Sequence, residues 1–385
     1  MTLDATQVIS WILDDARESE DDPAFLAGFA RCLVEHGVRL FRVGTSLRPI
    51  DPQVWVRNLR WERGQVATDD REREVRNDAE YLGSPIEAIH QGADRIRERL
   101  EHNPVPRFHT LATFASRGAT DYLILAIAGH EASRTFVAYA SEAAGGFRDD
   151  ELALLEAIHP AISCVVRLRT SRMTTSALLR TYLGQNAAKR VLSGQVERGR
   201  GETISAAIWF CDLRDFTVLS NELPAARLLQ LLDRYFETVS GAVVDEGGEI
   251  LKFIGDAMLA IFPVGEAGPA DACRRALGAA ITALDRFEVD VATLARPIAF
   301  GTSLHIGEVF YGNIGARDRL DFTVIGPAVN LAARVQGQCT ALATPLLMTS
   351  TFTAYLERTD LRSLGSHALK GIPTPPELAT LTRFG

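Results

Sequence analysis

The chain has 385 residues, of which 46% are hydrophobic and 23% charged, a composition that excludes collagen-like, coiled-coil-only and largely disordered proteins. At about 100 to 200 residues per domain, this length predicts two domains with separate cores. The 41 basic and 49 acidic residues give a net charge of −8 without any long basic run, so neither a nucleic acid nor an anionic membrane surface is expected as a partner.

The cysteines and the N-terminus indicate a reducing compartment. The cysteines are odd in number, far apart and without a CxxC pair, which argues against a disulfide framework and a zinc knuckle. They are Cys32, Cys164, Cys211, Cys273 and Cys339. The N-terminus is acidic where a signal peptide is basic, and no apolar stretch approaches the roughly 18 residues of a membrane span. We therefore expect a cytoplasmic protein without a membrane segment.

The first part of the chain, residues 1–167, reads as a mixed α/β domain. Apolar residues three or four apart predict a helix over residues 22–40. Two runs of β-branched and aromatic residues, 40–47 and 55–61, predict strands that flank a proline-containing break and form a hairpin or meander. The charged segment 69–78 is expected to be exposed.

The end of this domain carries a stronger pattern. Residues 121–128 and 135–141 predict two strands, and the F-R-D-D sequence at 147–150 predicts the cap of a long helix. Over residues 105–168 this pattern resembles the C-terminal half of GAF-type sensor domains, and any α/β domain with a terminal helix is the alternative. The histidines in this half lack metal-ligand spacing and are interpreted as exposed or structural.

Residues 168–201 read as a helical connector. A narrow apolar stripe runs along it, with arginines and a lysine between its members. The stripe consists of Leu178, Leu179, Tyr182, Leu183, Ala187, Ala188, Val191 and Leu192. Such a stripe favours a parallel contact with the same helix of a second copy, and docking on the chain's own C-terminal domain is the alternative. Gly194 and the sequence G-R-G at 199–201 are expected to end the helix.

The C-terminal part begins with a run typical of a buried strand, residues 204–211, which ends at Asp212. A helix is predicted from Pro224, near its first position, to Asp245. Asp212 therefore lies at a strand end beside the backbone amides of the following turn. Alone, it is as typical of a turn as of a metal ligand.

A second acidic residue lies in a tight hairpin. The apolar runs 250–254 and 257–262 predict two strands, joined by Gly255 and Asp256. Glycine in the first position of a two-residue loop favours a type II′ turn, so Asp256 is expected at the tip. Alone, this pair of residues indicates no more than a good turn.

Four blocks in order change that interpretation. They are F-C-D-L-R-D-F-T at 210–217, K-F-I-G-D-A at 252–257, G-P-A-V-N-L-A-A-R at 326–334 and L-K-G-I-P at 369–373. This series resembles the catalytic domain of the class III nucleotidyl cyclases over about residues 202–382. The resemblance implies a ferredoxin-like domain at 202–385 whose catalytic sites form between two copies arranged head to tail, and hence a homodimer with two equivalent sites.

The resemblance also implies a reaction and its metal ligands. Adenylate cyclases convert ATP to 3′,5′-cyclic AMP and pyrophosphate through attack of the ribose 3′ hydroxyl on the α-phosphorus. On the family pattern, Asp212 and Asp256 hold two divalent cations, Mg²⁺ or Mn²⁺, for which carboxylate oxygens are suitable ligands. The backbone amides around Phe216 and Thr217 are expected to bind substrate phosphates.

Further substrate contacts follow from the third and fourth blocks. Asn330 and Arg334 are four residues apart in a predicted helix, so their side chains share one face. The family pattern implies that Asn330 orients the ribose and that Arg334 stabilises charge at the α-phosphate. Lys370 matches the family's lysine for the terminal phosphates. For the base, Lys252 matches the adenine-selecting lysine, and Thr323 is expected to accept from the exocyclic amine, which favours ATP over GTP.

Two positions depart from the family pattern. Asp215 stands where many relatives have glycine, and adds a third carboxylate whose role the sequence leaves open. An arginine used by some relatives corresponds to either Arg317 or Arg319, and is left unassigned.

Three other functions are weighed against adenylate cyclase. A guanylate cyclase is the main alternative, and a catalytically silent nucleotide-binding signalling module is a second. A diguanylate cyclase is disfavoured because E-G-G-E at 246–249 lacks the G-G-D/E-E-F order. The N-terminal domain is expected to regulate the C-terminal one in response to a small molecule or protein signal that no residue identifies.

Overall fold

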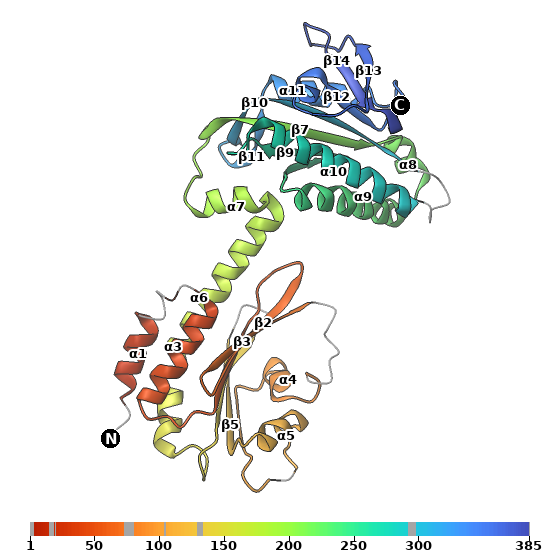
Figure 1. The fold of residues 1–385 in the computed structure, drawn as a ribbon. Coiled ribbons are helices and arrows are strands. Elements are labelled where there is room, and N and C mark those ends of the chain that lie inside the picture. Colours follow the sequence, from red (N-terminus) through yellow and green to blue (C-terminus); the bar gives the residue numbers. More distant parts are fainter. Residues whose placement is uncertain are drawn as a thin grey trace. The chain divides into compact units, whose positions relative to one another are not determined.

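The computed structural model describes residues 4–14, 19, 21–72, 81–103, 105–128, 134–291 and 298–384. It divides into two compact units, Met1–Thr181 and Tyr182–Gly385, shown in Figure 1. The mixed α/β fold expected from the sequence is confirmed in both.

The N-terminal unit is built on a six-stranded antiparallel sheet in the order β3-β2-β1-β6-β5-β4. Its strands are β1 (Arg42–Leu47), β2 (Val54–Glu62), β3 (Gln65–Glu72), β4 (Arg95–Arg99), β5 (Asp121–Ile127) and β6 (Thr135–Ser141). Its helices are α1 (Ala5–Leu13), α3 (Asp22–Glu35), α4 (Pro85–His90), α5 (His109–Ser116) and the long α6 (Asp149–Leu183).

Two cores lie on opposite faces of this sheet. On one face α1, α3 and α6 bury apolar side chains of the strands, and five apolar positions of α6, spaced three or four apart, are buried. Those positions are Leu152, Leu155, Ile158, Ile162 and Val166. On the other face α4 and α5 form a smaller core with Phe41, Ile124 and Phe136. The sheet is therefore covered on both sides.

One expectation for this unit needs correction, and another agrees with the described residues. The helix predicted over residues 22–40 ends at Glu35, because Gly37 adopts a φ of 86° and the amide of Val38 donates to Leu33 O at 3.0 Å, a capping motif that stops the helix. The charged segment predicted as exposed over 69–78 is exposed at Asp69, Asp70 and Glu72, and it belongs to strand β3 as far as Glu72. Its remaining residues, like the turn between β5 and β6, lie outside the described part.

The connector differs from a single apolar helix. Helix α6 ends at Leu183, Gly184 takes a φ of 83°, and a new helix α7 (Gln185–Leu192) begins. Ala187 and Ala188 pack into the core of the C-terminal unit, whereas the Tyr182 side chain is 81% exposed. The C-terminal part of the stripe therefore docks on the chain's own C-terminal unit, which was the alternative weighed for it.

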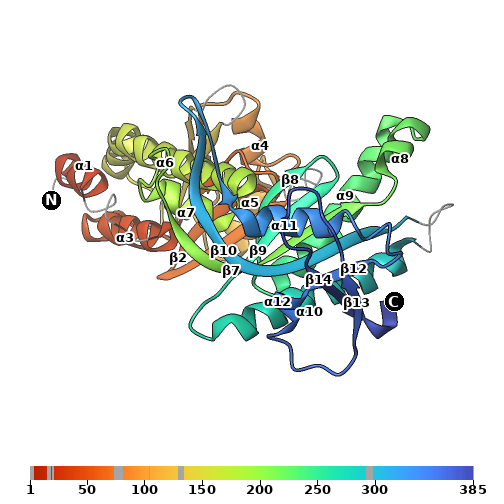
Figure 2. The ribbon, with the colours of Figure 1, turned by 90° about the horizontal axis from the view of Figure 1, so that it is seen from above.

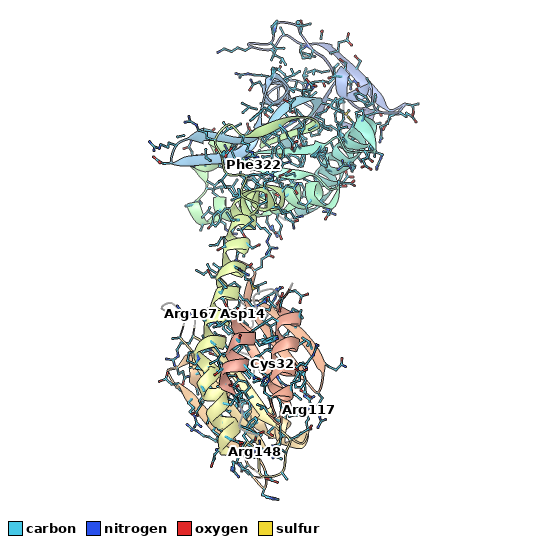
Figure 3. All side chains as sticks on the ribbon, turned by 90° about the vertical axis from the view of Figure 1, so that its left-hand side faces the viewer. Asp14, Cys32, Arg117, Arg148, Arg167 and Phe322 are labelled. Carbon is cyan, nitrogen blue, oxygen red and sulfur yellow. The ribbon has the colours of Figure 1, made fainter. Side chains whose placement is uncertain are left out.

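Polar contacts also hold α7 on this sheet. Asn186 donates to the buried Glu249 at 3.0 Å, and Glu249 accepts from the Tyr311 hydroxyl at 2.8 and 2.9 Å. The guanidinium of Arg190 lies 4.8 Å from the ring centroid of Tyr311, which in turn packs edge-on against Phe322 at 4.7 Å. Figure 3 labels Phe322 within the C-terminal unit.

The C-terminal unit contains an eight-stranded sheet whose path runs β13-β14-β12-β10-β7-β9-β8, with β11 paired to β10. Its strands are β7 (Gly201–Leu213), β8 (Glu249–Ile254), β9 (Ala257–Pro263), β10 (Phe300–Ala316), β11 (Arg319–Ile325), β12 (Leu346–Thr349), β13 (Leu361–Ser366) and β14 (Glu377–Leu381). Its helices after α7 are α8 (Phe216–Glu222), α9 (Ala225–Asp245), α10 (Gly268–Val291), α11 (Pro327–Gln336) and α12 (Ser350–Thr353).

The order β7-α9-β8-β9-α10-β10 is that of a ferredoxin-like fold. Helices α9 and α10 lie side by side on one face of the sheet, and α11 lies on the other (Figure 1). Every residue of β7 pairs with β10, from Gly201 opposite Gly312 to Leu213 opposite Phe300. Among the described residues, no helix is both long and apolar enough to cross a bilayer.

Candidate active site

The two predicted metal ligands come together at one end of the central strands. Asp212 is the penultimate residue of β7, and Asp256 is the second residue of the β8–β9 turn. Strand β9 pairs with β7 so that Met258 lies opposite Cys211, which brings the turn beside the end of β7. Gly255 has a φ of 65° and Asp256 does not have a positive φ, so the predicted type II′ turn is confirmed.

The surroundings of this pair are suited to a cation. Asp212 Oδ1 is buried and has no hydrogen-bond partner in the described part of the chain. Burial, and secondly the neighbouring Asp256 carboxylate, raise the pKa of Asp212 to about 7. Two adjacent carboxylates without a basic partner repel each other, and a divalent cation between them would remove that repulsion.

The carboxylate pair needs further oxygen ligands to complete a metal site. Within the described ranges, no group of three or more histidine, cysteine, aspartate or glutamate side chains could hold a metal ion. Mg²⁺ is commonly held by one or two carboxylates together with substrate phosphates and water. The pair Asp212 and Asp256 therefore fits a metal that binds together with a phosphorylated substrate.

The turn after β7 contains an element that sequence analysis missed. Helix α8 begins directly after Asp215, so that Phe216 and Thr217 form its first turn, and it leads into α9 (Figure 2). Asp215 has a φ of 56° and a ψ of 26°, a left-handed conformation that glycine adopts more easily. A glycine at this position, which the resemblance implies for many relatives, would adopt this conformation without strain. Pro224, predicted near the first helical position of α9, precedes that helix as its N-cap.

A second cluster forms around Lys252. Its ammonium donates to Asp321 Oδ2 at 2.5 Å, and this contact lowers the pKa of Asp321. Asp321 was not among the predicted site residues. It stands two positions before Thr323 on β11, so the two side chains share a face of the strand, and Thr323 is 7% exposed. Alternate residues of β11 share a face of the strand, so the prediction of Thr323 as a site residue could have indicated Asp321 as well.

Helix α11 presents the two predicted polar residues away from its own sheet. Ala328, Ala332 and Val335 are buried, whereas Asn330 and Arg334 are exposed. Helical spacing had predicted that these two polar residues share one face, and the observed helix agrees.

The side chains of three predicted site residues have no partner in the described part of the chain. The side chains of Asn330, Arg334 and the exposed Lys370, in the loop after β13, form no hydrogen bond or ion pair with any residue in the described ranges. No such interaction joins them to Asp212 or Asp256 either. In the described part of one chain, the predicted residues thus form no single hydrogen-bonded or ion-paired cluster. Arg317 and Arg319 are both exposed near the β10–β11 turn, and the structure does not choose between them.

Comparison with known proteins agrees with this arrangement. Residues 200–380 match the family model of the adenylate and guanylate cyclase catalytic domain. An adenylate cyclase of Anabaena cylindrica is 34% identical over 147 residues, which are 37% of this chain and 29% of that protein. The terminal-differentiation specific adenylate cyclase of Dictyostelium discoideum is 30% identical over 150 residues, which are 38% of this chain and 7% of that protein. The chain therefore spans a minor part of the length of these relatives.

The fold is shared with a solved structure. A bacterial light-regulated adenylyl cyclase superposes with a TM-score of 0.50 at 23% sequence identity, and the match covers 58% of this chain and 65% of that one. The family match and the curated relatives support a class III adenylate/guanylate cyclase catalytic domain in the C-terminal unit, and the likeness to the solved structure supports its fold.

Proposed function

We propose that the chain is an adenylate cyclase, which converts ATP to 3′,5′-cyclic AMP and pyrophosphate at sites shared by two copies of the C-terminal unit. The observation that carries this proposal is the carboxylate pair, in which a buried oxygen of Asp212 lacks a partner beside Asp256. The pair lies in a domain of the cyclase family, whose members use divalent metal ions.

The reaction forms one bond and breaks one. The ribose 3′ oxygen bonds to the α-phosphorus, the bond from that phosphorus to the bridging oxygen of the β-phosphate breaks, and the 3′ hydroxyl loses its proton. Two divalent cations, Mg²⁺ or Mn²⁺, supply charge neutralisation at the phosphates and lower the pKa of the hydroxyl. The part of Asp212 and Asp256 is to hold these cations at the end of β7.

The remaining side chains position substrate. Arg334 faces solvent and has no partner in the described part, so its guanidinium is free to bind charge developing at the α-phosphate. Asn330, one turn earlier, can orient the ribose, and Lys370 can bind the terminal phosphates. The first turn of α8, with Phe216 and Thr217, lies next to the carboxylates and can contact phosphate through backbone amides.

Base selection follows from hydrogen-bond chemistry at Lys252 and Thr323. The Lys252 ammonium is a donor that suits the N1 acceptor of adenine and not the N1 donor of guanine. Thr323 can accept from the exocyclic amine. The ion pair with Asp321 fixes the direction of the Lys252 side chain, and it supports the assignment of ATP over GTP.

Two copies are needed because the catalytic residues lie in separate groups. In a head-to-tail homodimer, the carboxylate pair of one copy would face Asn330, Arg334 and Lys252 of the other, giving two equivalent sites. Mixing Asp212→Ala with Arg334→Ala, each inactive alone, should restore activity, since one intact site can form per heterodimer. Failure of complementation, or only monomer in sedimentation at active concentrations, would contradict the shared site.

The N-terminal unit is proposed as a GAF-like regulatory domain acting on a cytoplasmic enzyme. Its antiparallel sheet, covered on both faces and followed by a long exit helix, supports this assignment. The domain limits 1–167, 168–201 and 202–385 remain part of the proposal.

Product analysis tests the proposed reaction directly. Purified protein is incubated with ATP or GTP and Mn²⁺ or Mg²⁺, and the products are separated by chromatography. Cyclic AMP from ATP is expected, with loss in Asp256→Ala and retention in the control Asp233→Ala, an exposed residue of α9. Cyclisation of GTP alone would identify a guanylate cyclase, and nucleotide binding without turnover a silent signalling module.

The base assignment has its own test. The double substitution Lys252→Glu with Thr323→Cys should shift the preference toward GTP in competition kinetics. An unchanged preference would contradict the roles given to these two residues.

A further inference from the structure

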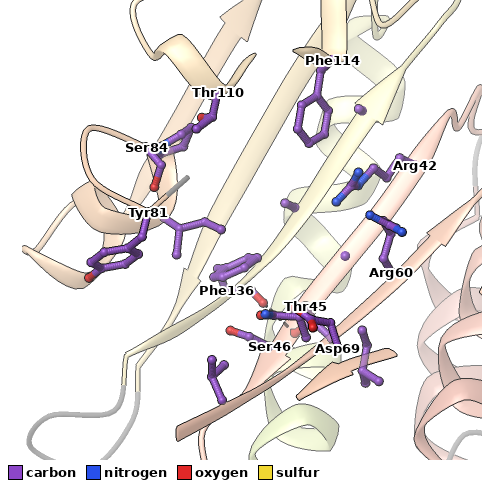
Figure 4. Close-up of a pocket in the computed structure, with 18 of the residues that line it drawn as sticks. Arg42, Thr45, Ser46, Arg60, Asp69, Tyr81, Ser84, Thr110, Phe114 and Phe136 are labelled. Carbon is purple, nitrogen blue, oxygen red and sulfur yellow. Dashed lines mark hydrogen bonds between the residues drawn. The ribbon is translucent and has the colours of Figure 1, made fainter. Parts of the chain in front are cut away.

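The N-terminal unit contains a cavity of about 800 Å³ on the sheet face that carries α4 and α5. Strands β1, β2 and β3 contribute to its walls, as do residues of both helices (Figure 4). Cavities of roughly 300 to 1,000 Å³ are typical of sites for small organic molecules. The space is therefore large enough for a metabolite-sized ligand.

The lining of this cavity is strongly cationic. Among the described residues that line it are five arginines and one carboxylate, that of Asp69. The arginines are Arg42, Arg48, Arg60, Arg71 and Arg117. Arg71 is paired with Asp69 at 2.9 Å, and Glu62 is shared by Arg42, at 3.4 Å, and Arg117.

Two of these arginines converge without sufficient counter-charge. Arg42 on β1 and Arg60 on β2 lie on the same face of neighbouring strands, because Arg42 pairs with Glu62 and Gly44 with Arg60. Figure 4 shows their guanidinium groups side by side. The side chain of Arg60 has no ion pair or hydrogen bond with a residue that the structure describes. Burial, and secondly the charge of Arg60, lower the pKa of Arg42 to about 10.

Space for an anion lies directly over this pair. Gly44, opposite Arg60, lines the cavity, and a Cβ built there would meet only the backbone oxygen of Leu59, at 3.4 Å. A carboxylate or phosphate can accept from two guanidinium groups at once, which is the geometry in which arginine binds anions most strongly.

The rest of the cavity is suited to an apolar body with a polar end. The ring of Phe114 lies 4.5 Å from the Arg42 guanidinium carbon, and Phe136 and Tyr122 are almost fully buried in the wall. His90 Nδ1 contacts the Tyr81 hydroxyl at 2.9 Å, whereas its buried Nε2 has no hydrogen-bond partner in the described part of the chain. That nitrogen is available to a polar atom of a ligand.

We propose that this cavity binds an organic anion, with its carboxylate or phosphate between Arg42 and Arg60 and an aromatic body against Phe114 and Phe136. The proposal rests on the N-terminal unit alone and is independent of the cyclase assignment.

Displacement of a fluorescent probe from the full chain tests the proposal. The probe is 1-anilinonaphthalene-8-sulfonate. In Gly44→Val the valine side chain would project into the cavity, so only the probe fluorescence that this variant abolishes is attributed to the cavity. Benzoate and phenyl phosphate are the anionic competitors, and their comparison distinguishes a carboxylate ligand from a phosphate ligand. Benzyl alcohol and benzylamine are the neutral and cationic controls. We expect at least one of the two anions to compete about tenfold better than either control.

Substitutions assign this preference to the arginine pair. Arg60→Gln should weaken the preferred anion by roughly tenfold to a hundredfold, and Arg60→Lys should retain most of the binding. Arg31→Gln, on an exposed position of α3 beyond the opposite face of the sheet, is the matched control and should change nothing. Because Arg60 is exposed and has no ion pair in the described part, its substitution should leave folding intact.

Three results would overturn the proposal. They are equal competition by anions and controls, unchanged anion binding in Arg60→Gln, and the absence of any probe signal that Gly44→Val removes. Inorganic phosphate competing as well as phenyl phosphate would overturn the aromatic part of the assignment.

Discussion

Replacing Asp256 by asparagine should stabilise the metal-free protein while abolishing catalysis. A pKa of about 7 in place of 3.8 corresponds to at most about 4 kcal/mol against ionised Asp212 in the folded state, and solvent screening of this half-buried carboxylate reduces that energy. Burial is the largest cause and Asp256 follows it, so we assign to the second carboxylate on the order of 1–2 kcal/mol. At pH 8, above the pKa of Asp212, Asp256→Asn should raise the free energy of unfolding by about this amount.

Urea unfolding in EDTA measures this gain, with Asp233→Asn as a control that removes an exposed charge of α9. The gain should disappear as the pH falls below 7, because Asp212 is then protonated in the folded state and no repulsion remains to be relieved. Addition of Mn²⁺ should reverse the order, since binding at a hundred times the dissociation constant stabilises the wild type by about 2.7 kcal/mol and the variant much less. Destabilisation of the metal-free variant at pH 8, or a wild type insensitive to Mn²⁺, would refute the reasoning.

Three further substitutions address other parts of the C-terminal unit. Tyr311→Phe removes a hydrogen-bond donor from the buried Glu249 and should lower the free energy of unfolding by about 2 kcal/mol. In a Glu249→Gln background the same change should lower it by about 1 kcal/mol. Urea unfolding of the four proteins measures this coupling, and equal losses in both backgrounds would show that the hydrogen bond carries no charge-assisted energy. Burial lowers the pKa of His305 to about 4, below its unfolded value near 6.5, so folding stability should fall by up to about 3 kcal/mol as the pH drops from 6.5 to 4. His305→Gln should flatten this part of the stability curve, and a parallel curve would contradict the assignment. Asp215→Gly removes the strain of a left-handed backbone conformation and should raise the free energy of unfolding by about 0.5–1 kcal/mol. Thermal unfolding measures this gain. A lower melting temperature would show that the Asp215 side chain stabilises the domain by more than its backbone strain destabilises it.

The parts of the site that sequence could predict are those set by local pattern. The tip of the β8–β9 hairpin follows from glycine followed by Asp256 between two apolar runs, and the common face of Asn330 and Arg334 follows from helical spacing. Asp212 was placed at its strand end because the preceding residues are continuously apolar. Each of these inferences depends on fewer than about a dozen neighbouring residues.

The parts that were missed depend on distant contacts or backbone strain. The ion pair between Lys252 and Asp321 joins residues far apart in sequence, so no local period reveals it. Strand β3 is an edge strand rich in charged side chains and lacks the alternation of a half-buried strand. The break at Gly184 falls inside an apolar stripe that continues on both sides, so the stripe alone predicted one helix.

The unbroken pairing of β7 with β10 limits how the length of this domain can change during evolution. Side chains alternate between the two faces of a strand, so one inserted residue would turn every following side chain to the opposite face. Asp212 would then exchange places with its apolar neighbours, and the pairs from Gly201 to Leu213 would lose their partners in β10. Insertions and deletions in related chains should therefore accumulate in the loops outside these two strands, and the strands should keep their length even where their residues have changed.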